Sequence, residues 1–320
     1  MILSLLGFLF SLAILLAGAD LLVRGAALTA QKLGIPPLVA GLTIVAFGTS
    51  APELVVNVFS ALKGNSEIAL SNILGSNIAN ILLVLGLSAS LSRLKIQENT
   101  IWKDIPFALL SLLILLAMSH DKYLDKTEDT LSRTDGLSLI GFFTIFVYYS
   151  VSLARREFFS SSRGRVDSPL LISLSFLLIG LLGLFWGGDS VVDQAVELAR
   201  KAGISETFIG FTAVAVGTSL PELATSVVAA LRQQADIAVG NVIGSNIFNV
   251  FWILGITSVI QPLRVPPHIQ SDIWFCLAST FVLFLVVLTG RRDQIGPKGA
   301  LLLLFLYVGY LVYLFWREAL

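Results

Sequence analysis

Two glutamates stand among small polar residues, in segments that are otherwise apolar enough for a lipid bilayer. Glu53 ends the run GTSAPE and Glu222 ends the run GTSLPE. At helical spacing, the hydroxyl residues three and four positions before each glutamate share a face with its carboxylate. These hydroxyl residues are Thr49, Ser50, Thr218 and Ser219. Because an ionisable group inside a membrane segment is costly and usually functional, the two runs favour cation binding.

A second polar set follows each glutamate along the chain. In the runs NILGSNIAN and NVIGSNIFN, polar residues recur every four positions and so form one stripe on a helix. The stripe residues are Asn72, Ser76, Asn80, Asn241, Ser245 and Asn249. Glycines nearby are expected to let helices pack closely. They are Gly75, Gly86, Gly244 and Gly255.

The donor atoms of both sets are all oxygens. Pro52 and Pro221 lack an N–H and crowd the carbonyl four residues earlier, so they are expected to weaken their helices and free backbone carbonyls. Oxygen donors without histidine or cysteine suit Ca²⁺, Na⁺ or Mg²⁺ rather than zinc or copper. Two carboxylates in a low-dielectric site need one divalent or several monovalent cations to balance them. If Ca²⁺ and Na⁺ use overlapping ligands, each must leave before the other binds, and obligatory exchange follows.

The two polar centres belong to an internal duplication. Sliding the chain by 169 residues aligns 20–86 with 189–255 without a gap, and 30 of those 67 positions are identical. Asp20 and Asp189 also repeat, and each either belongs to an ion pathway or hydrogen-bonds a neighbouring helix end. Arg24, one turn after Asp20, is a candidate ion-pair partner for it.

Composition places the chain in a membrane. Hydrophobic residues make up 56% of it and charged residues 13%, and the mean hydropathy is +0.87, far outside the range of soluble domains. The 21 basic and 21 acidic residues cancel, so the charge suggests no nucleic-acid partner. The single cysteine, Cys276, cannot form an internal disulfide and is expected to serve packing.

Ten segments are long enough to span about 30 Å of hydrocarbon, which takes ~20 helical residues. They lie at 2–30, 37–62, 67–91, 103–119, 136–154, 169–199, 206–231, 236–260, 271–289 and 299–316. Five segments per half place the second copy upside down, which is the inverted-repeat plan of many secondary transporters. The expected fold class is therefore all-α integral membrane, with ten transmembrane helices as two inverted five-helix repeats. The expected domains are a first repeat at 1–154, a short basic cytoplasmic linker at 155–168 and a second repeat at 169–320.

Basic residues set the expected orientation. They concentrate in the connectors after the third, fifth and ninth segments, as Arg93, Lys95, Lys103, Arg155, Arg156, Arg163, Arg165, Arg291, Arg292 and Lys298. By the positive-inside rule these connectors face the cytoplasm and both termini are extracellular. The expected location is the cell membrane, which the chain crosses many times.

The runs GTSAPEL with GSNIAN, and GTSLPEL with GSNIFN, resemble the two alpha repeats of the sodium/calcium exchanger family, within the cation/calcium antiporter superfamily. The resemblance covers essentially the whole chain and implies a prokaryotic-type membrane domain without a large regulatory loop. It implies exchange of Na⁺ for Ca²⁺ by alternating access, in which the first and sixth helices slide past a fixed core. It places the alpha repeats at about 37–91 and 206–260.

The resemblance also implies a ligand set for both ions at one midplane site. The implied ligands are Glu53, Glu222, Thr49, Ser50, Thr218, Ser219, Ser76, Asn80, Ser245 and Asn249, with backbone carbonyls at Ala46 and Ala215. Some family members, including the potassium-dependent branch, carry Asp where this chain has Asn249, so potassium dependence is not expected. The proton-coupled branch carries GNATE or GNAVE instead of GTSxPE, which favours sodium coupling.

Other functions stay open on the residues alone. The first alternative is an antiporter of the same fold that is driven by protons or carries another divalent cation. The second is a passive cation channel with the same oxygen-lined centre. An enzyme is not expected, because no nucleophile, acid–base or metal-hydrolase spacing occurs in the helices. The expected ligands are transported Ca²⁺ and Na⁺, with no cofactor and no obligate protein partner.

Overall fold

The computed structural model describes residues 2–124, 126, 128–160, 170–201, 217–290 and 293–319. In that part of the chain, eight helices are long and apolar enough to cross a membrane, and a bent pair makes a ninth. The eight are Ser4–Leu33, Ser66–Leu91, Thr100–Met118, Arg133–Arg155, Leu170–Lys201, Ala235–Ile260, Pro267–Thr289 and Pro297–Arg317. Of the expected span 206–231, the structure describes only the end, which forms the shorter apolar helix Leu220–Leu231.

The described helices divide between the two halves of the chain. The first half contains α1 (Ile2–Leu33), α2 (Pro37–Ala40), α3 (Ala46–Thr49), α4 (Ala51–Leu62), α5 (Ser66–Ala79), α6 (Leu85–Leu91), α7 (Ile105–Met118), α8 (Asp121–Leu124) and α9 (Arg133–Ser160). The second contains α10 (Leu170–Lys201), α12 (Leu220–Leu231), α13 (Ala235–Ile247), α14 (Gly255–Ile260), α15 (Pro267–Thr289) and α16 (Pro297–Ala319). Wider π-helical turns at Gly41–Val45, Asn80–Val84, Thr100–Asp104 and Phe248–Leu254 join some of these helices.

The second span is broken beside its proline, as predicted. The axes of Pro37–Thr49 and Ala51–Leu62 differ by 44°, and Pro52 lies in the first turn of α4. Proline is tolerated there because the first turn of a helix needs no internal N–H donor. Pro221 occupies the matching place in α12. The two prolines therefore start the helices that carry Glu53 and Glu222.

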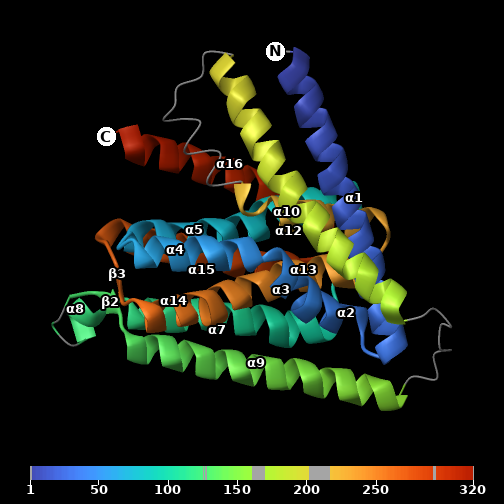
Figure 1. Ribbon diagram of the computed structural model, residues 1–320. Coiled ribbons are helices and arrows are strands. Elements are labelled where there is room, and N and C mark those ends of the chain that lie inside the picture. The colour runs from blue at the N-terminus through green and yellow to red at the C-terminus, as the bar shows by residue number, and fades with distance from the viewer. Residues whose placement is uncertain are drawn as a thin grey trace.

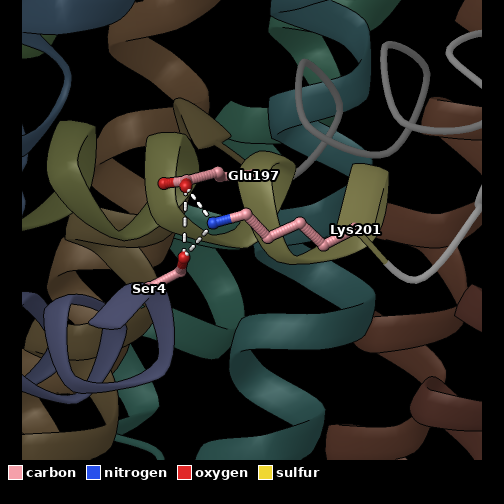
Figure 2. Close-up of polar contacts among 3 residues, drawn as sticks. All are labelled: Ser4, Glu197 and Lys201. Carbon is pink, nitrogen blue, oxygen red and sulfur yellow. Dashed lines mark hydrogen bonds and ion pairs between the residues drawn. The ribbon is translucent and has the colours of Figure 1, made fainter. Parts of the chain in front are cut away.

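The long helices α1 and α10 run side by side in opposite directions and cross the other helices obliquely (Figure 1). Their backbones touch at glycines, because a Cβ built on Gly183 would lie 3.0 Å from Cα of Gly18. Figure 2 shows the outer end of the pair, where Ser4 donates to Glu197 at 3.1 Å and accepts from Lys201 at 2.6 Å. Small residues at a helix interface permit this close approach.

The spans Ser66–Leu91 and Ala235–Ile260 form the centre of the molecule. Of their most apolar 18-residue window, 78% is buried, against 22% to 39% in the other spans. α9 lies along one edge of the bundle (Figure 1), where it packs against α14. The two polar stripes thus lie on the most enclosed helices.

Four two-residue strands in the described residues join connectors from opposite halves. β1 (Leu94–Lys95) pairs antiparallel with β4 (Gln294–Ile295), and β2 (Thr130–Leu131) pairs antiparallel with β3 (Leu263–Arg264). The connectors after the third and ninth spans therefore share one side of the helical layer, where the expected order of the spans also places them.

Candidate cation site

The two glutamates lie at the start of α4 and α12. Each is the third residue of its helix, and each is only 1% exposed. Within the described part of the chain, neither forms an ion pair with Lys, Arg or His. Two carboxylates are thus buried together without a cationic side chain, an arrangement that is costly unless something else balances the charge.

Hydroxyl groups from both repeats surround the carboxylates. Ser50 Oγ donates to Glu222 Oε1 at 3.1 Å, and Ser245 Oγ donates to the same oxygen at 3.4 Å. Ser76 Oγ donates to Glu53 Oε1 at 3.5 Å. Because Ser50 and Glu222 come from different repeats, the centre is complete only where the two repeats meet.

The threonines reach across the same interface. Thr49 Oγ1 donates to Asn241 Oδ1 at 3.0 Å, and Thr218 Oγ1 donates to Asn72 Oδ1 at 3.2 Å. Each bond joins a threonine of one repeat to an asparagine of the other, and the two bonds are related by the 169-residue offset. The polar stripes of the central helices therefore face the residues that precede α4 and α12.

Asn80 and Asn249 lie in π-helical turns and contact two asparagines that the ligand expectations did not include. Asn80 Nδ2 donates to Asn246 Oδ1 at 3.1 Å, and Asn249 Nδ2 donates to Asn77 Oδ1 at 2.9 Å. Asn77 and Asn246 also stand 169 residues apart in the runs GSNIAN and GSNIFN. That duplication is the signal that could have identified them.

Several buried oxygens at the centre have no hydrogen-bond partner among the described residues. They are Glu53 Oε2, Glu222 Oε2, Asn80 Oδ1, Asn249 Oδ1 and Ser219 Oγ. A buried polar atom without a partner is destabilising, and carboxylate and amide oxygens are the ligands that hard cations prefer. These residues therefore fit a hard cation bound as cargo. No group of three or more His, Cys, Asp or Glu that could hold a metal occurs in the described residues, so neutral oxygens must complete the coordination.

Of the two backbone carbonyls expected as ligands, the structure describes only that of Ala46. The carbonyl of Ala46 accepts the backbone N–H of Ser50 at 3.0 Å and the hydroxyl of Thr49 at 3.4 Å, which places it beside the hydroxyl ligands. Ala215 lies outside the described residues. Ser219 follows Thr218 at the start of α12, and Ser219 is 4% exposed.

A cavity of about 640 Å³ extends to the centre from one side of the molecule. Its outer wall includes Gly64, Glu67 and Arg264, and its inner wall includes Asn72 and Ser76. Because Ser76 bonds to Glu53, the cavity ends one hydrogen bond away from that carboxylate.

The glycines of the repeats differ in their surroundings. A Cβ on Gly244 would lie 2.6 Å from the carbonyl oxygen of Leu42, and one on Gly86 would lie 3.0 Å from the Leu304 side chain. Gly255 is similarly tight against Ile140. The packing role expected for Gly75 is wrong for the described residues, none of which approaches its Cβ position within 4 Å, because Gly75 lines the cavity.

Comparison with known proteins identifies the family. The model of the family described as "Sodium/calcium exchanger protein" matches residues 3–152 and 172–316. The chain belongs to the sodium/calcium exchanger family. CaxA of Alkalimonas amylolytica is 35% identical over 323 residues, covering 96% of this chain and 97% of that protein. The sodium/calcium exchanger MaX1 of Methanosarcina acetivorans is 30% identical over 345 residues, covering 96% and 97%.

A solved structure agrees with these relatives. The sodium-calcium exchanger NCX_Mj, soaked without Na⁺ and Ca²⁺, superposes with a TM-score of 0.83 at 32% identity, covering 98% of this chain and 99% of that one. The exchanger family consists of transporters. Membership makes this chain a multi-pass membrane protein and a cation/Ca²⁺ antiporter, with Na⁺ and Ca²⁺ as the family's substrates.

Proposed function

We propose that this exchanger carries Na⁺ and Ca²⁺ in opposite directions by alternating access, and that both ions use one site between the repeats. The observation that carries the proposal is the set of buried, unpartnered oxygens around Glu53 and Glu222. One Ca²⁺ or several Na⁺ would neutralise the two carboxylates. An empty site with two bare carboxylates crosses the membrane poorly, so transport in one direction requires a return ion.

The site residues act as ligands in this proposal. The carboxylates balance the charge, and the hydroxyl and amide oxygens complete the coordination. The proposed ligands are Glu53, Glu222, Thr49, Ser50, Thr218, Ser219, Ser76, Asn80, Ser245 and Asn249, with the carbonyls of Ala46 and Ala215. Sodium coupling is favoured by the motif GTSxPE and by the names of MaX1 and NCX_Mj.

The proposed architecture is two inverted five-helix repeats, 1–154 and 169–320, joined by 155–168. The strand registers support it, because Leu94 pairs with Ile295 while Leu263, 169 residues after Leu94, pairs with Leu131. Each repeat thus contributes the same connector to an equivalent pairing on opposite sides. We place the protein in the cell membrane with both termini outside, since the basic connectors are then cytoplasmic.

Calcium uptake into proteoliposomes tests the coupling. Vesicles holding purified protein are loaded with Na⁺ and diluted into Na⁺-free buffer, beside choline-loaded vesicles and vesicles with a proton gradient. Uptake that requires internal Na⁺ supports the proposal. Uptake driven by a proton gradient alone would make the protein a proton-coupled antiporter, and uptake without any counter-ion gradient would make it a channel.

A further inference from the structure

Asparagines in the central helices bond to four of the proposed ligands, always across the repeat interface. We propose that Asn72, Asn77, Asn241 and Asn246, here called the asparagine frame, are positioning residues that aim the oxygens of Thr218, Asn249, Thr49 and Asn80 at the transported cation. The inference rests on the proposed function, because it takes these four residues as ligands. The frame residues are 7%, 1%, 0% and 2% exposed, in that order.

The amide ligands show how the frame sets orientation. A side-chain amide has a donor end and an acceptor end, and only the acceptor end can bind a cation. The Nδ2 group of Asn80 donates to a frame oxygen at 3.1 Å, and that of Asn249 donates to another at 2.9 Å. Their Oδ1 atoms are left without a hydrogen bond among the described residues. If either amide turned over, its NH₂ group would face the cation and its Oδ1 would face a frame oxygen.

Asn77 and Asn246 of the frame are themselves held by hydrogen bonds. Asn246 Nδ2 donates to the backbone carbonyl of Asn77 at 3.2 Å, and Asn77 Nδ2 donates to the backbone carbonyl of Asn246 at 3.3 Å. Because both donor groups are used on backbone, both Oδ1 atoms must face the ligands. The two asparagines therefore form a reciprocal bridge between the central helices.

The threonine ligands follow the same rule. The shortest bond that each hydroxyl donates goes to a frame oxygen, from Thr49 to Asn241 at 3.0 Å and from Thr218 to Asn72 at 3.2 Å. The alternative partners, the Ala46 carbonyl for Thr49 and the Ser76 hydroxyl for Thr218, lie at 3.4 Å and 3.3 Å. The oxygen lone pairs are then available to a cation. Asn241 is held in turn by its Nδ2, which donates to Ser226 Oγ at 2.9 Å. In all four cases a ligand of one repeat is aimed by the other repeat, so the site is ordered only when both are docked.

A double-mutant cycle on the full chain tests the role of Asn77. Ca²⁺ binding to purified protein in detergent is followed as the rise in Tm over a Ca²⁺ titration in Na⁺-free buffer. Asn249→Ala and Asn77→Ala are each expected to weaken Ca²⁺ binding, Asn77→Ala by about 10- to 100-fold as for partners that orient a metal ligand. Because Asn77 acts through Asn249, the double variant is expected to bind within about twofold of Asn249→Ala alone.

Two outcomes would overturn the inference, and they distinguish failure of the positioning role from failure of the ligand assignment. If the losses of Asn77→Ala and Asn249→Ala multiply in the double variant, Asn77 does not act through Asn249, although Asn249 remains a ligand. If Asn249→Ala binds Ca²⁺ like the wild type, the ligand assignment of the proposed function fails, and the inference falls with it. Should Asn77→Ala not yield folded protein, Asn77→Ser and the equivalent pair Asn246 with Asn80 serve in the same cycle.

Thr280 provides the control for packing. It is fully buried like the frame residues, but its Oγ1 donates to the backbone carbonyl of Cys276 at 3.0 Å, one turn earlier in α15. Thr280→Ala is expected to lower Tm in the absence of Ca²⁺ while Ca²⁺ affinity stays within about twofold of the wild type. An equal loss of affinity in Thr280→Ala and Asn77→Ala would show a general packing effect and would contradict positioning.

Discussion

Glu53 and Glu222 carry the only negative charges among the proposed ligands, so each is half of the balance against a bound Ca²⁺. Glu53→Gln and Glu222→Gln keep the size of the side chain and remove one charge. Unit charges about 4 Å apart interact by about 4 kcal/mol at an effective dielectric constant of ~20. Na⁺-driven Ca²⁺ uptake is therefore expected to fall below about 1% of the wild type in each variant. Uptake into Na⁺-loaded proteoliposomes measures the loss.

Folding is expected to survive these changes, because each removes a buried charge that has no ion-pair partner among the described residues. Size-exclusion profiles in detergent check this. Glu128→Gln is a control, since that side chain is 78% exposed and pairs with Arg264 on the surface. Wild-type exchange by either buried variant would defeat the assignment of the two glutamates.

Asn249→Asp would add a third carboxylate to the centre. Coulomb attraction grows with the charge of the ion, so Ca²⁺ binding is expected to gain at least about tenfold more than Na⁺ binding. The substitution also removes the Nδ2 donor to Asn77, which is expected to lower Tm modestly. Competition between the two ions in Tm titrations measures the preference. An unchanged preference would argue against contact between residue 249 and the cation.

At this scale the sequence indicates most of what meets at the centre. Spacing and duplication single out the glutamates, the hydroxyls and the stripe residues, and the structure brings most of these side chains within hydrogen-bond distance of one another. Ser219 Oγ has no partner in the described residues, and Asn80 and Asn249 bond to the frame instead. Asn77 and Asn246 were harder to predict from the sequence, because each donates a hydrogen bond to a residue on a different helix. Sequence spacing within one helix does not reveal such a bond.

At the scale of the elements, the outer helices carry a correspondence that the sequence repeat does not show. The fourth and fifth spans of each half match only in hydropathy. In the first half Tyr149 donates to Asp104 at 3.0 Å, and in the second Arg317 donates to Asp272 at 2.8 Å, with 45 residues between the partners in both cases. Both aspartates are at least 98% buried. The two contacts therefore occupy equivalent places in the two halves, although only the aspartate is the same residue type in both.

The two pairs are expected to respond differently to removal of the charge. Asp272→Asn leaves the Arg317 guanidinium without its carboxylate, which is expected to cost about 1–3 kcal/mol, since hydrogen bonds to charged groups contribute about this much. Asp104→Asn keeps an acceptor for Tyr149 and removes a buried carboxyl that has one oxygen unpartnered in the described residues, so Tm is expected to stay equal or rise. Thermal unfolding of both variants in the same detergent compares them. A larger decrease in Tm for Asp104→Asn than for Asp272→Asn would contradict this expectation.

At the scale of the whole molecule, an ion pair connects α1 to the second repeat. Asp20 in α1 pairs with Arg24 at 2.9 Å and with Arg232, which follows the end of α12. In the other repeat, Asp189 corresponds to Asp20 and Lys63 corresponds to Arg232, each at an offset of 169 residues. In the described part of the chain, Asp189 and Lys63 form no ion pair. In a transporter built from inverted repeats, the outward-open and inward-open states are related by symmetry. A contact made by the first repeat in one state is therefore expected to be made by the second repeat in the other state. The Asp20–Arg232 pair is therefore expected to open in the opposite state, while Asp189 pairs with Lys63.

Arg232→Gln is accordingly expected to weaken the state seen here, in which the cavity beside Ser71 is present together with the Asp20–Arg232 pair. Both partners are partly exposed, at 37% and 27%, so the pair contributes at most about 1 kcal/mol and the population shifts by a few-fold. Ser71→Cys reports the state through its rate of reaction with a membrane-impermeant maleimide, since the native Cys276 is buried. In that background, Arg232→Gln is expected to slow labelling and Lys63→Gln to accelerate it. Equal rates in both variants, or changes in the same direction, would show that these ion pairs do not distinguish the two states.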